Sequence, residues 1–259
     1  MLRLMSYNVH ICIGMDGRLS PERIARVIAQ YRPHVVALQE LDVGRARTDE
    51  ADQAHEIARR LKMEFHFHPS LRVEEELYGD AVLSRLPLRL VKAGGLPGLP
   101  LFEPRGALWV EIATPAGPLQ FLNTHLGLTR RERRLQTDAL MGPDWLDSAD
   151  TEGPWVLAGD LNALPRSRTC RRFGERLRDA QLAVDDHRPQ ATFFARRPTA
   201  RIDYIFVDPS VDVVAARVPS AFLAKVASDH LPLIVDIRLP VPNRGSAVAP
   251  SRSRTEVVG

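Results

Sequence analysis

The chain has 259 residues, of which 44% are hydrophobic and 26% are charged, and its formal net charge is +3. This balance is typical of a globular protein with a substantial core, and it excludes a chain that is disordered throughout. Two cysteines are too few for a disulfide framework and lack the spacing of a zinc site. We expect one domain over residues 1–239 and an unstructured tail over residues 240–259, which has no periodic apolar face.

The N-terminal residues do not form the pattern of a signal peptide, because no basic stretch is followed by a long apolar run and a small-residue cleavage site. No apolar run approaches the length of a membrane span. We therefore expect a cytoplasmic protein, without stable membrane insertion, that acts as a monomer. The 35 Lys and Arg residues are consistent with an anionic partner.

The first predicted elements form a strand, helix and strand unit. Apolar and polar residues alternate over residues 2–9, which predicts a strand that ends near Asn8. A Ser-Pro start and apolar residues at helical spacing predict a helix over residues 20–31. Residues 34–38 form a buried strand that ends at Glu40. Because a helical crossover joins parallel strands, Asn8 and Glu40 are expected at the same edge of a sheet.

The middle of the chain is predicted to be rich in strands. Residues 52–62 place apolar side chains on one face of a helix. Short strands then follow at residues 64–68, 80–84, 88–92, 106–113 and 119–124. The last of these strands leads into His125, and the Pro-Ala-Gly-Pro sequence at residues 115–118 predicts a hairpin turn before it.

The C-terminal half adds two predicted helices and four predicted strands. Thr129 and Glu132 have the spacing of a capping box and begin a helix that is expected to reach about residue 146. An arginine-rich helix is expected after Pro165, ending near residue 182. The strands are predicted at residues 155–158, 202–207, 211–218 and 231–239. Hairpins combined with a crossover favour a mixed α/β sandwich over a barrel.

Polar side chains recur where these predicted strands end. Taken singly, a strand-end Asp or His is more often a turn former or a satisfied hydrogen-bonding group. These residues come from six separate segments, however, and that is how a site is built at one rim of a sheet scaffold. They are Asn8, Glu40, His125, Asp160, Asn162, Asp203, Asp229 and His230.

This set of side chains is rich in oxygen and poor in sulfur. Carboxylates and carboxamides are hard ligands, which suit Mg²⁺ or Mn²⁺. Hydrolysis of a phosphodiester needs a cation at the phosphate oxygens, a base for water and an acid or metal at the leaving oxygen. His230, with Asp203 available to hold its ring, supplies a pair of the kind that raises imidazole basicity. The set therefore contains the parts that such a reaction requires.

Seven short motifs carry a resemblance to a known family. They are YNVH (7–10), LQE (38–40), GDAVLSR (79–85), NTHL (123–126), GDLN (159–162), IDYI (202–205) and SDHLP (228–232). In order and spacing they resemble the endonuclease/exonuclease/phosphatase superfamily, which includes DNase I, exonuclease III-type repair enzymes, neutral sphingomyelinases and inositol polyphosphate 5-phosphatases. The resemblance covers residues 2–239 and is greatest to small bacterial members. It implies a four-layered αββα sandwich, with two packed mixed β-sheets flanked by helices, and a Mg²⁺-dependent phosphoester hydrolase.

The resemblance also implies a metal centre. Glu40 is its principal ligand, with Asn8 and Asp229 nearby, and the number of ions is left open. Many bacterial members have asparagine where this chain has Asp80, which either supplies another ligand or faces solvent. Arg105 resembles a residue near the substrate and either binds phosphate or forms an exposed salt bridge.

The remaining site residues receive roles in the chemistry by the same resemblance. Asp160 orients or deprotonates the attacking water, or protonates the leaving group. Asn162 binds a phosphate oxygen. His230 is hydrogen-bonded to Asp203, and His125 is the second histidine at the scissile phosphate.

The motifs leave the identity of the phosphoester open. Positive charge is expected on the same rim, from Arg130, Arg131, Arg133 and Arg134 and from Arg196, Arg197 and Arg201. This favours an extended polyanion such as DNA or RNA, although aromatic residues are only 6% of the chain and mark no stacking platform. A phospholipid or another small phosphodiester or phosphomonoester is the alternative, since the Leu- and Pro-rich loop at residues 94–102 can form a lipid-binding lip. A catalytically inactive binding protein is the third alternative, but none of the principal positions is lost.

Overall fold

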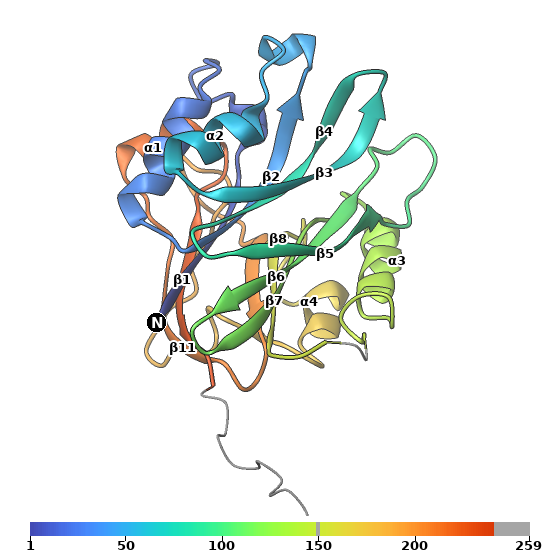
Figure 1. The fold of residues 1–259 in the computed structure, drawn as a ribbon, viewed down its shortest axis with the longest axis vertical. Helices are drawn as coiled ribbons and strands as arrows, with labels where there is room; N and C mark the ends of the chain where they lie inside the picture. Colours follow the sequence, from blue (N-terminus) through green and yellow to red (C-terminus); the bar gives the residue numbers. More distant parts are fainter. Residues whose placement is uncertain (149–150, 241–259) are drawn as a thin grey trace, which may run out of the picture.

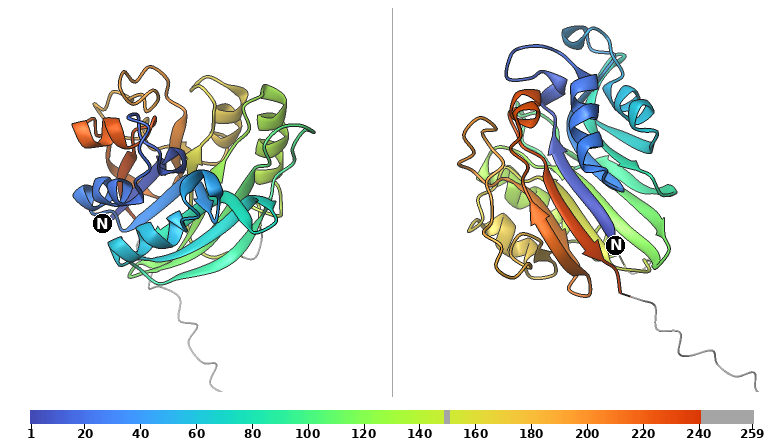
Figure 2. Two further views of the ribbon diagram at one scale, coloured as in Figure 1. Left: turned by 90° about the horizontal axis from the view of Figure 1, so that it is seen from above. Right: turned by 90° about the vertical axis from the view of Figure 1, so that its left-hand side faces the viewer.

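Two six-stranded β-sheets pack face to face in the computed structural model, which describes residues 1–148 and 151–240 (Figure 1). Viewed from above, α1, α2 and α5 lie on one side of the paired sheets, and α3 and α4 lie on the other (Figure 2). The predicted sandwich of two mixed sheets between helices is confirmed. The predicted tail lies outside the described residues from residue 241 onward.

The first sheet has the strand order β11-β12-β1-β2-β4-β3. Its strands are β1 (Leu2–Asn8), β2 (Val35–Val43), β3 (Glu64–Val73), β4 (Glu76–Ser84), β11 (Asp212–Arg217) and β12 (Leu233–Arg238). β1 and β2 are parallel, and the other neighbours are antiparallel. Asn8 lies opposite Gln39 in this register, so the end of β1 meets the middle of β2.

The second sheet has the strand order β5-β6-β7-β8-β10-β9. Its strands are β5 (Leu88–Gly95), β6 (Gly106–Thr114), β7 (Gly117–His125), β8 (Trp155–Asp160), β9 (Arg178–Asp179) and β10 (Asp203–Val207). β7 and β8 are parallel, and their register places His125 opposite Asp160. β8 and β10 are antiparallel, and their register places Asp203 opposite Asp160. Three predicted site residues are therefore neighbours on adjacent strands.

The helices cover the outer faces of the two sheets. They are α1 (Pro21–Tyr31), α2 (Gln53–Leu61), α3 (Arg130–Leu140), α4 (Arg168–Phe173) and α5 (Phe222–Ala227), with short 3-10 turns η1 (His10–Cys12) and η2 (Ala46–Thr48). As predicted, Ser20 caps α1 by accepting from the backbone N–H of Arg23. The predicted capping box of α3 is also present, since Thr129 and Glu132 each accept from the other's backbone N–H.

Several predicted elements differ in length from the observed ones: β3, β4 and β5 are longer than predicted, and two helices and the strand that carries Glu40 also end at other residues. α3 ends at Leu140 rather than near residue 146, because Pro143 disfavours helix at Gly142 and cannot continue it. α4 ends at Phe173 rather than near residue 182, and the chain beyond it pairs with β10 as β9. β2 does not stop at Glu40 but continues to Val43 through an irregularity in its pairing with β4.

The core has two parts, one on each side of the second sheet. The larger part fills the space between the sheets and extends under α1 and α2. The smaller part packs α3 and α4 on the outer face of the second sheet, where Trp109 and Trp155 have ring centroids 4.7 Å apart. β8 is buried along its whole length. Asp160 is thereby fixed on a rigid central strand.

Candidate active site

The predicted site residues meet at one end of the sandwich, where β1, β7 and β8 all terminate (Figure 1). A cavity of about 330 Å³ opens there. The predicted residues that line it are Glu40, Arg105, His125, Asp160, Asn162, Asp229 and His230. The cavity thus collects side chains from both sheets and from the loops that follow their strands.

An interruption in β2 places Glu40. The pairing of β2 with β4 shifts register between Leu38 and Leu41, and Glu40 has a φ of 60°. A positive φ at a residue other than glycine is strained by about 1–3 kcal/mol, and such strain clusters at functional sites. At this bulge the Glu40 carboxylate accepts a 2.8 Å hydrogen bond from the Asn8 amide.

Asp160 is the centre of the site. It is 1% exposed, and its Oδ2 accepts a 3.0 Å hydrogen bond from the Asn8 amide. The Nε2 atoms of His125 and His230 each lie 3.6 Å from the same oxygen. Burial, together with the nearby Asp203 carboxylate, raises the pKa of Asp160.

Gly159 allows β8 to approach β7 closely enough to form the site. Its φ is 152°, and a Cβ atom at this position would lie 1.8 Å from the carbonyl oxygen of Thr124. Only glycine fits there without movement of a strand. The parallel pairing that places Asp160 beside His125 therefore requires glycine at position 159, immediately before Asp160.

His230 is held by a buried carboxylate. Its Nδ1 lies 2.8 Å from Asp203 Oδ2, and Asp203 is fully buried. The ring also packs against Phe193, with ring centroids 4.9 Å apart. Burial lowers the pKa of His230, but the charges of Asp203 and Asp160 outweigh it and raise the pKa to about 10. The two carboxylates therefore favour the protonated form of His230, whose Nε2 faces Asp160.

His125 has the opposite electrostatic environment. Arg105 Nη1 lies 3.0 Å from its Nδ1, and Asn162 Nδ2 lies 3.0 Å from its Nε2. Both neighbours are nitrogen donors, so they disfavour a protonated ring. Burial, followed by the charge of Arg105, lowers the pKa of His125 well below its usual value. The surroundings of the two histidines therefore shift their pKa values in opposite directions.

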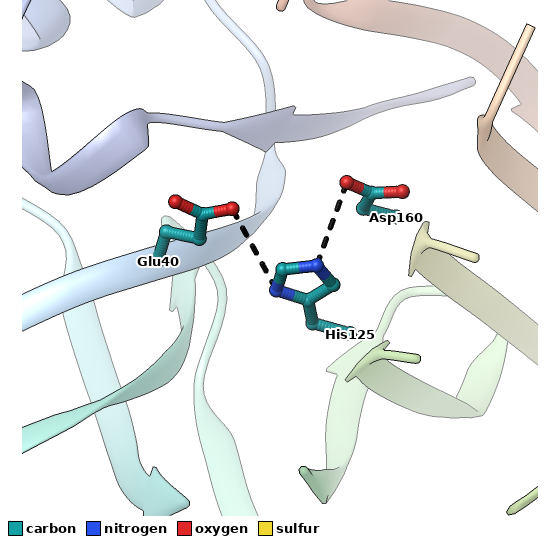
Figure 3. A group of neighbouring side chains, drawn as sticks. All are labelled: Glu40, His125 and Asp160. Atoms are coloured by element: carbon teal, nitrogen blue, oxygen red, sulfur yellow. Dashed lines mark ion pairs between the residues drawn. The ribbon is translucent and has the colours of Figure 1, made fainter. Parts of the chain in front are cut away.

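Two overlapping groups of side chains can hold a metal ion. Glu40, His125 and Asp160 offer ligand atoms within 4.8 Å of one another, as do Asp160, Asp203 and His230 (Figure 3 shows the first group). In the second group, His230 and Asp203 are already hydrogen-bonded to each other. Burial raises the pKa of both Glu40 and Asp160, so two charged carboxylates at this depth call for a cation. Their hard oxygen atoms fit a divalent ion such as Mg²⁺.

Three predicted metal-site residues stand apart from these groups. Asn8 turns its amide nitrogen to Glu40 and Asp160, and its Oδ1 accepts from the N–H of His10. Asp229 lines the cavity, half-buried, but belongs to neither group. Asp80 does not face solvent, because it is 4% exposed and lies beneath the Glu40 backbone, whose N–H is 3.4 Å from Asp80 Oδ1. Burial raises the pKa of Asp80 to about 7.

Arg105 is not an exposed residue. It is 7% exposed, lines the cavity and forms an ion pair with Glu103 at 2.7 Å. Arg201, expected on the basic rim, is also occupied, because it pairs with Asp179 at 2.7 Å.

Two supporting features were not identified from the sequence. Gln39 donates a 2.8 Å hydrogen bond to Asn123, whose amide donates to the carbonyl oxygens of Leu38 and Ala81. This buried network ties the two sheets together beneath the site. Gln39 and Asn123 both lie inside family motifs, which was an available signal. Phe193, which packs on His230, lies in no motif and had no local signal.

Comparison with known proteins identifies the family. The sequence model of the Endonuclease/Exonuclease/phosphatase family matches residues 5–230. The chain belongs to this family. Enzymes of the Endonuclease/Exonuclease/phosphatase family hydrolyse phosphoesters and generally use a divalent metal ion, so this chain is a phosphoester hydrolase with groups that can bind such an ion.

One curated sequence and several solved structures are similar to this chain. The chain is 28% identical over 199 residues to Uncharacterized protein YbhP of Escherichia coli, covering 71% of this chain and 72% of the relative. It is also 28% identical to an endonuclease/exonuclease/phosphatase of Beutenbergia cavernae of known structure, with a TM-score of 0.74 over 92% of this chain and 71% of that one. The mannosyl-6-phosphatase Bt3783 of Bacteroides thetaiotaomicron shares the fold, with a TM-score of 0.76 at 18% identity over 92% of this chain and all (100%) of that one.

Among the described residues, none of the helices combines the length and the apolar character that a membrane span needs.

Proposed function

We propose that this protein is a Mg²⁺- or Mn²⁺-dependent phosphodiesterase that acts on nucleic acid. The observation that carries the substrate assignment is the junction of two cavities, one lined by both acidic and basic residues and one with no acidic lining residue. The cavity of the candidate active site contains the carboxylates of Glu40, Asp160 and Asp229, and it shares Asn162 and Leu128 with a second cavity whose charged residues are all arginines. A polyanion with one phosphate at the carboxylates and further phosphates at the arginines fits this arrangement.

Glu40 and Asp160 are the residues proposed to hold the cation, with Asp229 at the edge of the same cavity. A divalent ion bound there would neutralise phosphate charge and make water easier to deprotonate. Asn8 holds Glu40 and Asp160 together through its amide hydrogens. Its contribution is therefore to fix the separation of the two carboxylates.

Asp160 is proposed to orient the attacking water and accept its proton. Its Oδ2 faces the cavity between the two histidines, and its Oδ1 accepts a 2.8 Å hydrogen bond from the N–H of Asn162. One oxygen of the carboxylate is therefore fixed by the backbone while the other faces the reaction space. This arrangement gives the base a defined direction.

The other polar groups are proposed to bind the phosphate. His230 is locked by Asp203 and presents a charged Nε2–H, which can donate to a phosphate oxygen as negative charge develops. His125 and Asn162 lie beside it and can contact a second oxygen. Arg105 adds a fixed positive charge behind His125.

The test is a panel of phosphoesters incubated with Mg²⁺, with Mn²⁺ and with EDTA. It contains single-stranded and plasmid DNA, duplex DNA with an abasic site, RNA, phosphatidylglycerol vesicles, sphingomyelin and inositol phosphates. We expect hydrolysis of DNA or RNA at a higher kcat/KM than of any lipid or inositol phosphate. Preferential hydrolysis of a lipid or an inositol phosphate would contradict the nucleic acid assignment but not the reaction.

One observation favours phospholipid as the second candidate. Leu101 is completely exposed and Phe102 is 46% exposed, on the loop between β5 and β6 that also carries Glu103 and Arg105 into the cavity. Apolar side chains beside a phosphate site can enter a lipid surface. Replacing both with Ser should weaken sedimentation with anionic vesicles if lipid is the substrate, and should leave hydrolysis of oligonucleotides unaffected if it is not.

That the protein is cytoplasmic and monomeric stays a prediction.

A further inference from the structure

A large basic cavity adjoins the candidate active site. Its volume is about 960 Å³, and it lies between the N-terminal end of α3 and the segment that joins β8 to α4. We call it the arginine groove. Its charged lining residues are Arg130, Arg131, Arg133, Arg134, Arg166 and Arg168, and it has no acidic lining residue.

Five of these six arginines are not used by the fold. In the described ranges 1–148 and 151–240, none of the six lies within 4.0 Å of a carboxylate, whereas Arg105 and Arg201 each pair with one. Five of them are exposed, and Arg133 alone donates to backbone carbonyls, those of Gly127 and Leu128. Six positive charges in one groove contrast with a net charge of +3 for the whole chain. Like charges this close repel one another, so the groove is suited to an anion with several charges.

The groove continues directly from the candidate active site. Asn162 and Leu128 line both cavities, and Asn162 Nδ2 lies 3.0 Å from His125 Nε2. At its other end, Leu164 and Arg166 are shared with a third cavity of about 460 Å³. A chain of phosphates that reaches His125 can therefore continue without a break along the arginines.

The groove also offers apolar surface among its charges. Leu128 is 67% exposed and Leu164 is 60% exposed, and both line the groove. Nucleotides present an apolar sugar and base beside each phosphate, whereas inorganic polyphosphate or an inositol phosphate does not. Guanidinium groups can pair with phosphate in bidentate fashion and can also stack on bases. The mixed lining therefore fits a nucleotide chain.

We propose that the arginine groove binds the backbone of a single-stranded segment that runs on from the scissile phosphate. This inference rests on the proposed function and specifies its substrate. A concave groove between the end of a helix and a loop accepts a flexible strand whose bases are free, whereas a duplex is rigid and carries a second backbone. Because no aromatic side chain lines the groove, it offers no stacking platform, and binding depends mainly on the phosphates with little preference for sequence.

The experiment compares two groove variants with a matched control. Arg130→Glu with Arg134→Glu changes the α3 wall, and Arg166→Glu with Arg168→Glu changes the opposite wall. The control is Arg26→Glu with Arg59→Glu, two exposed arginines on α1 and α2 that cover the other sheet. Each protein is assayed with Mg²⁺ and with Mn²⁺ on a single-stranded oligonucleotide, on the same sequence as a duplex, on bis-p-nitrophenyl phosphate and on phosphatidylglycerol vesicles.

We expect the wild type to prefer the single strand to the duplex. In each groove variant, the ratio of kcat/KM for the oligonucleotide to kcat/KM for the small diester should fall by about tenfold or more, mainly through KM. The dependence of log(kcat/KM) on log[salt] should also become shallower by about 0.7 for each phosphate that the variant no longer binds. The control should keep the wild-type ratio and slope.

The outcomes separate the inference from the proposed function. If the wild type hydrolyses oligonucleotides but the groove variants keep its ratio and slope, the groove assignment is wrong. A preference for duplex in the wild type also overturns it. If the wild type hydrolyses neither oligonucleotides nor the small diester with any divalent ion, the proposed function itself fails. If it hydrolyses the small diester and anionic phospholipid but no nucleic acid, the groove belongs to a lipid-binding surface and the inference is overturned.

Discussion

At the residue scale, the site is defined by the different surroundings of two histidines. His230 is paired with the buried Asp203, whose charge raises the pKa of the ring, whereas His125 lies between the nitrogen donors of Arg105 and Asn162, and burial with the charge of Arg105 lowers its pKa. The sequence predicted both histidines and the Asp203 partner from family motifs. It did not predict the Arg105 contact, because Arg105 precedes β6 and His125 ends the neighbouring β7, and their side chains meet only once the register is set.

The role of His230 can be separated from its contribution to stability. In His230→Asn the new amide nitrogen can occupy the place of Nδ1 and keep the bond to Asp203, while the Nε2 group is lost. In His230→Ala both are lost, and Asp203 is left as a buried carboxylate without a partner. We expect kcat to fall about a hundredfold or more in both variants, but the free energy of unfolding to fall by about 3 kcal/mol or more only in His230→Ala.

Steady-state kinetics and urea denaturation measure the two effects. Full activity in folded His230→Asn would contradict the role proposed for Nε2. Equal stability of the two variants would mean that Asp203 does not depend on His230.

At the element scale, the pairing of strands brings most of the site residues together. The ends of β1, β6, β7 and β10 were predicted to within one residue, because their apolar runs end in polar or turn-forming residues, whereas β2, β3 and β5 run past their predicted ends. The bulge that turns Glu40 into the cavity could not be predicted, since it arises from the pairing of β2 with β4, about forty residues away in sequence. The end of α3 was missed although Gly142 and Pro143 are a local stop signal. The end of α4 was missed because arginine-rich sequence continues past Phe173 to residues that pair with β10.

Because β7 and β8 approach each other closely at Gly159, we expect a single added methyl group there to destabilise the protein strongly. Gly159→Ala should lower the free energy of unfolding by about 3 kcal/mol or more, because the new Cβ meets the Thr124 carbonyl and the φ of 152° is unfavourable for alanine. Gly98→Ala is a matched control, since a Cβ there meets nothing within 4 Å. It should change stability by no more than about 0.5 kcal/mol. Thermal or urea unfolding of both variants checks this, and a Gly159→Ala protein of wild-type stability would contradict the described pairing.

The capping box of α3 predicts a smaller effect at the mouth of the arginine groove. Thr129→Ala removes the hydroxyl that accepts from the Glu132 N–H and should lower the free energy of unfolding by about 1 kcal/mol. Thr129→Ser keeps the hydroxyl and should cost much less. If urea denaturation shows the same loss for Ala and Ser, the stabilising group is the methyl rather than the cap.

At the scale of the whole molecule, charge is distributed so that a cavity with both acidic and basic residues lies beside a groove whose charged residues are all arginines. The sequence predicted basic residues near the site but not which of them are available. Arg201 is occupied by Asp179, and Arg196 donates to the Met15 carbonyl, whereas the exposed arginines of α3 and the β8–α4 segment have no carboxylate neighbour among the described residues. Pairing of this kind depends on residues distant in sequence, which composition does not reveal.

This distribution predicts that salt affects large and small substrates differently. If three phosphates of a single strand bind in the groove, kcat/KM for an oligonucleotide should fall about twentyfold between 50 and 200 mM salt. Hydrolysis of bis-p-nitrophenyl phosphate, which cannot reach the groove, should change little. Parallel salt titrations with the two substrates test this, and the same salt response for both would count against the groove as a phosphate-binding surface.

The most direct test of the central claim is a metal titration of bis-p-nitrophenyl phosphate hydrolysis by the wild type and by Glu40→Gln. After treatment with EDTA and removal of the chelator, the wild type should be inactive, and Mg²⁺ or Mn²⁺ should restore its activity. Glu40→Gln, which loses one charge of the proposed ligand pair, should need a higher concentration of the ion for half-maximal activity. Wild-type activity that persists in EDTA, or a Glu40→Gln titration identical to that of the wild type, would contradict the assignment of this cluster as the metal site of a phosphodiesterase.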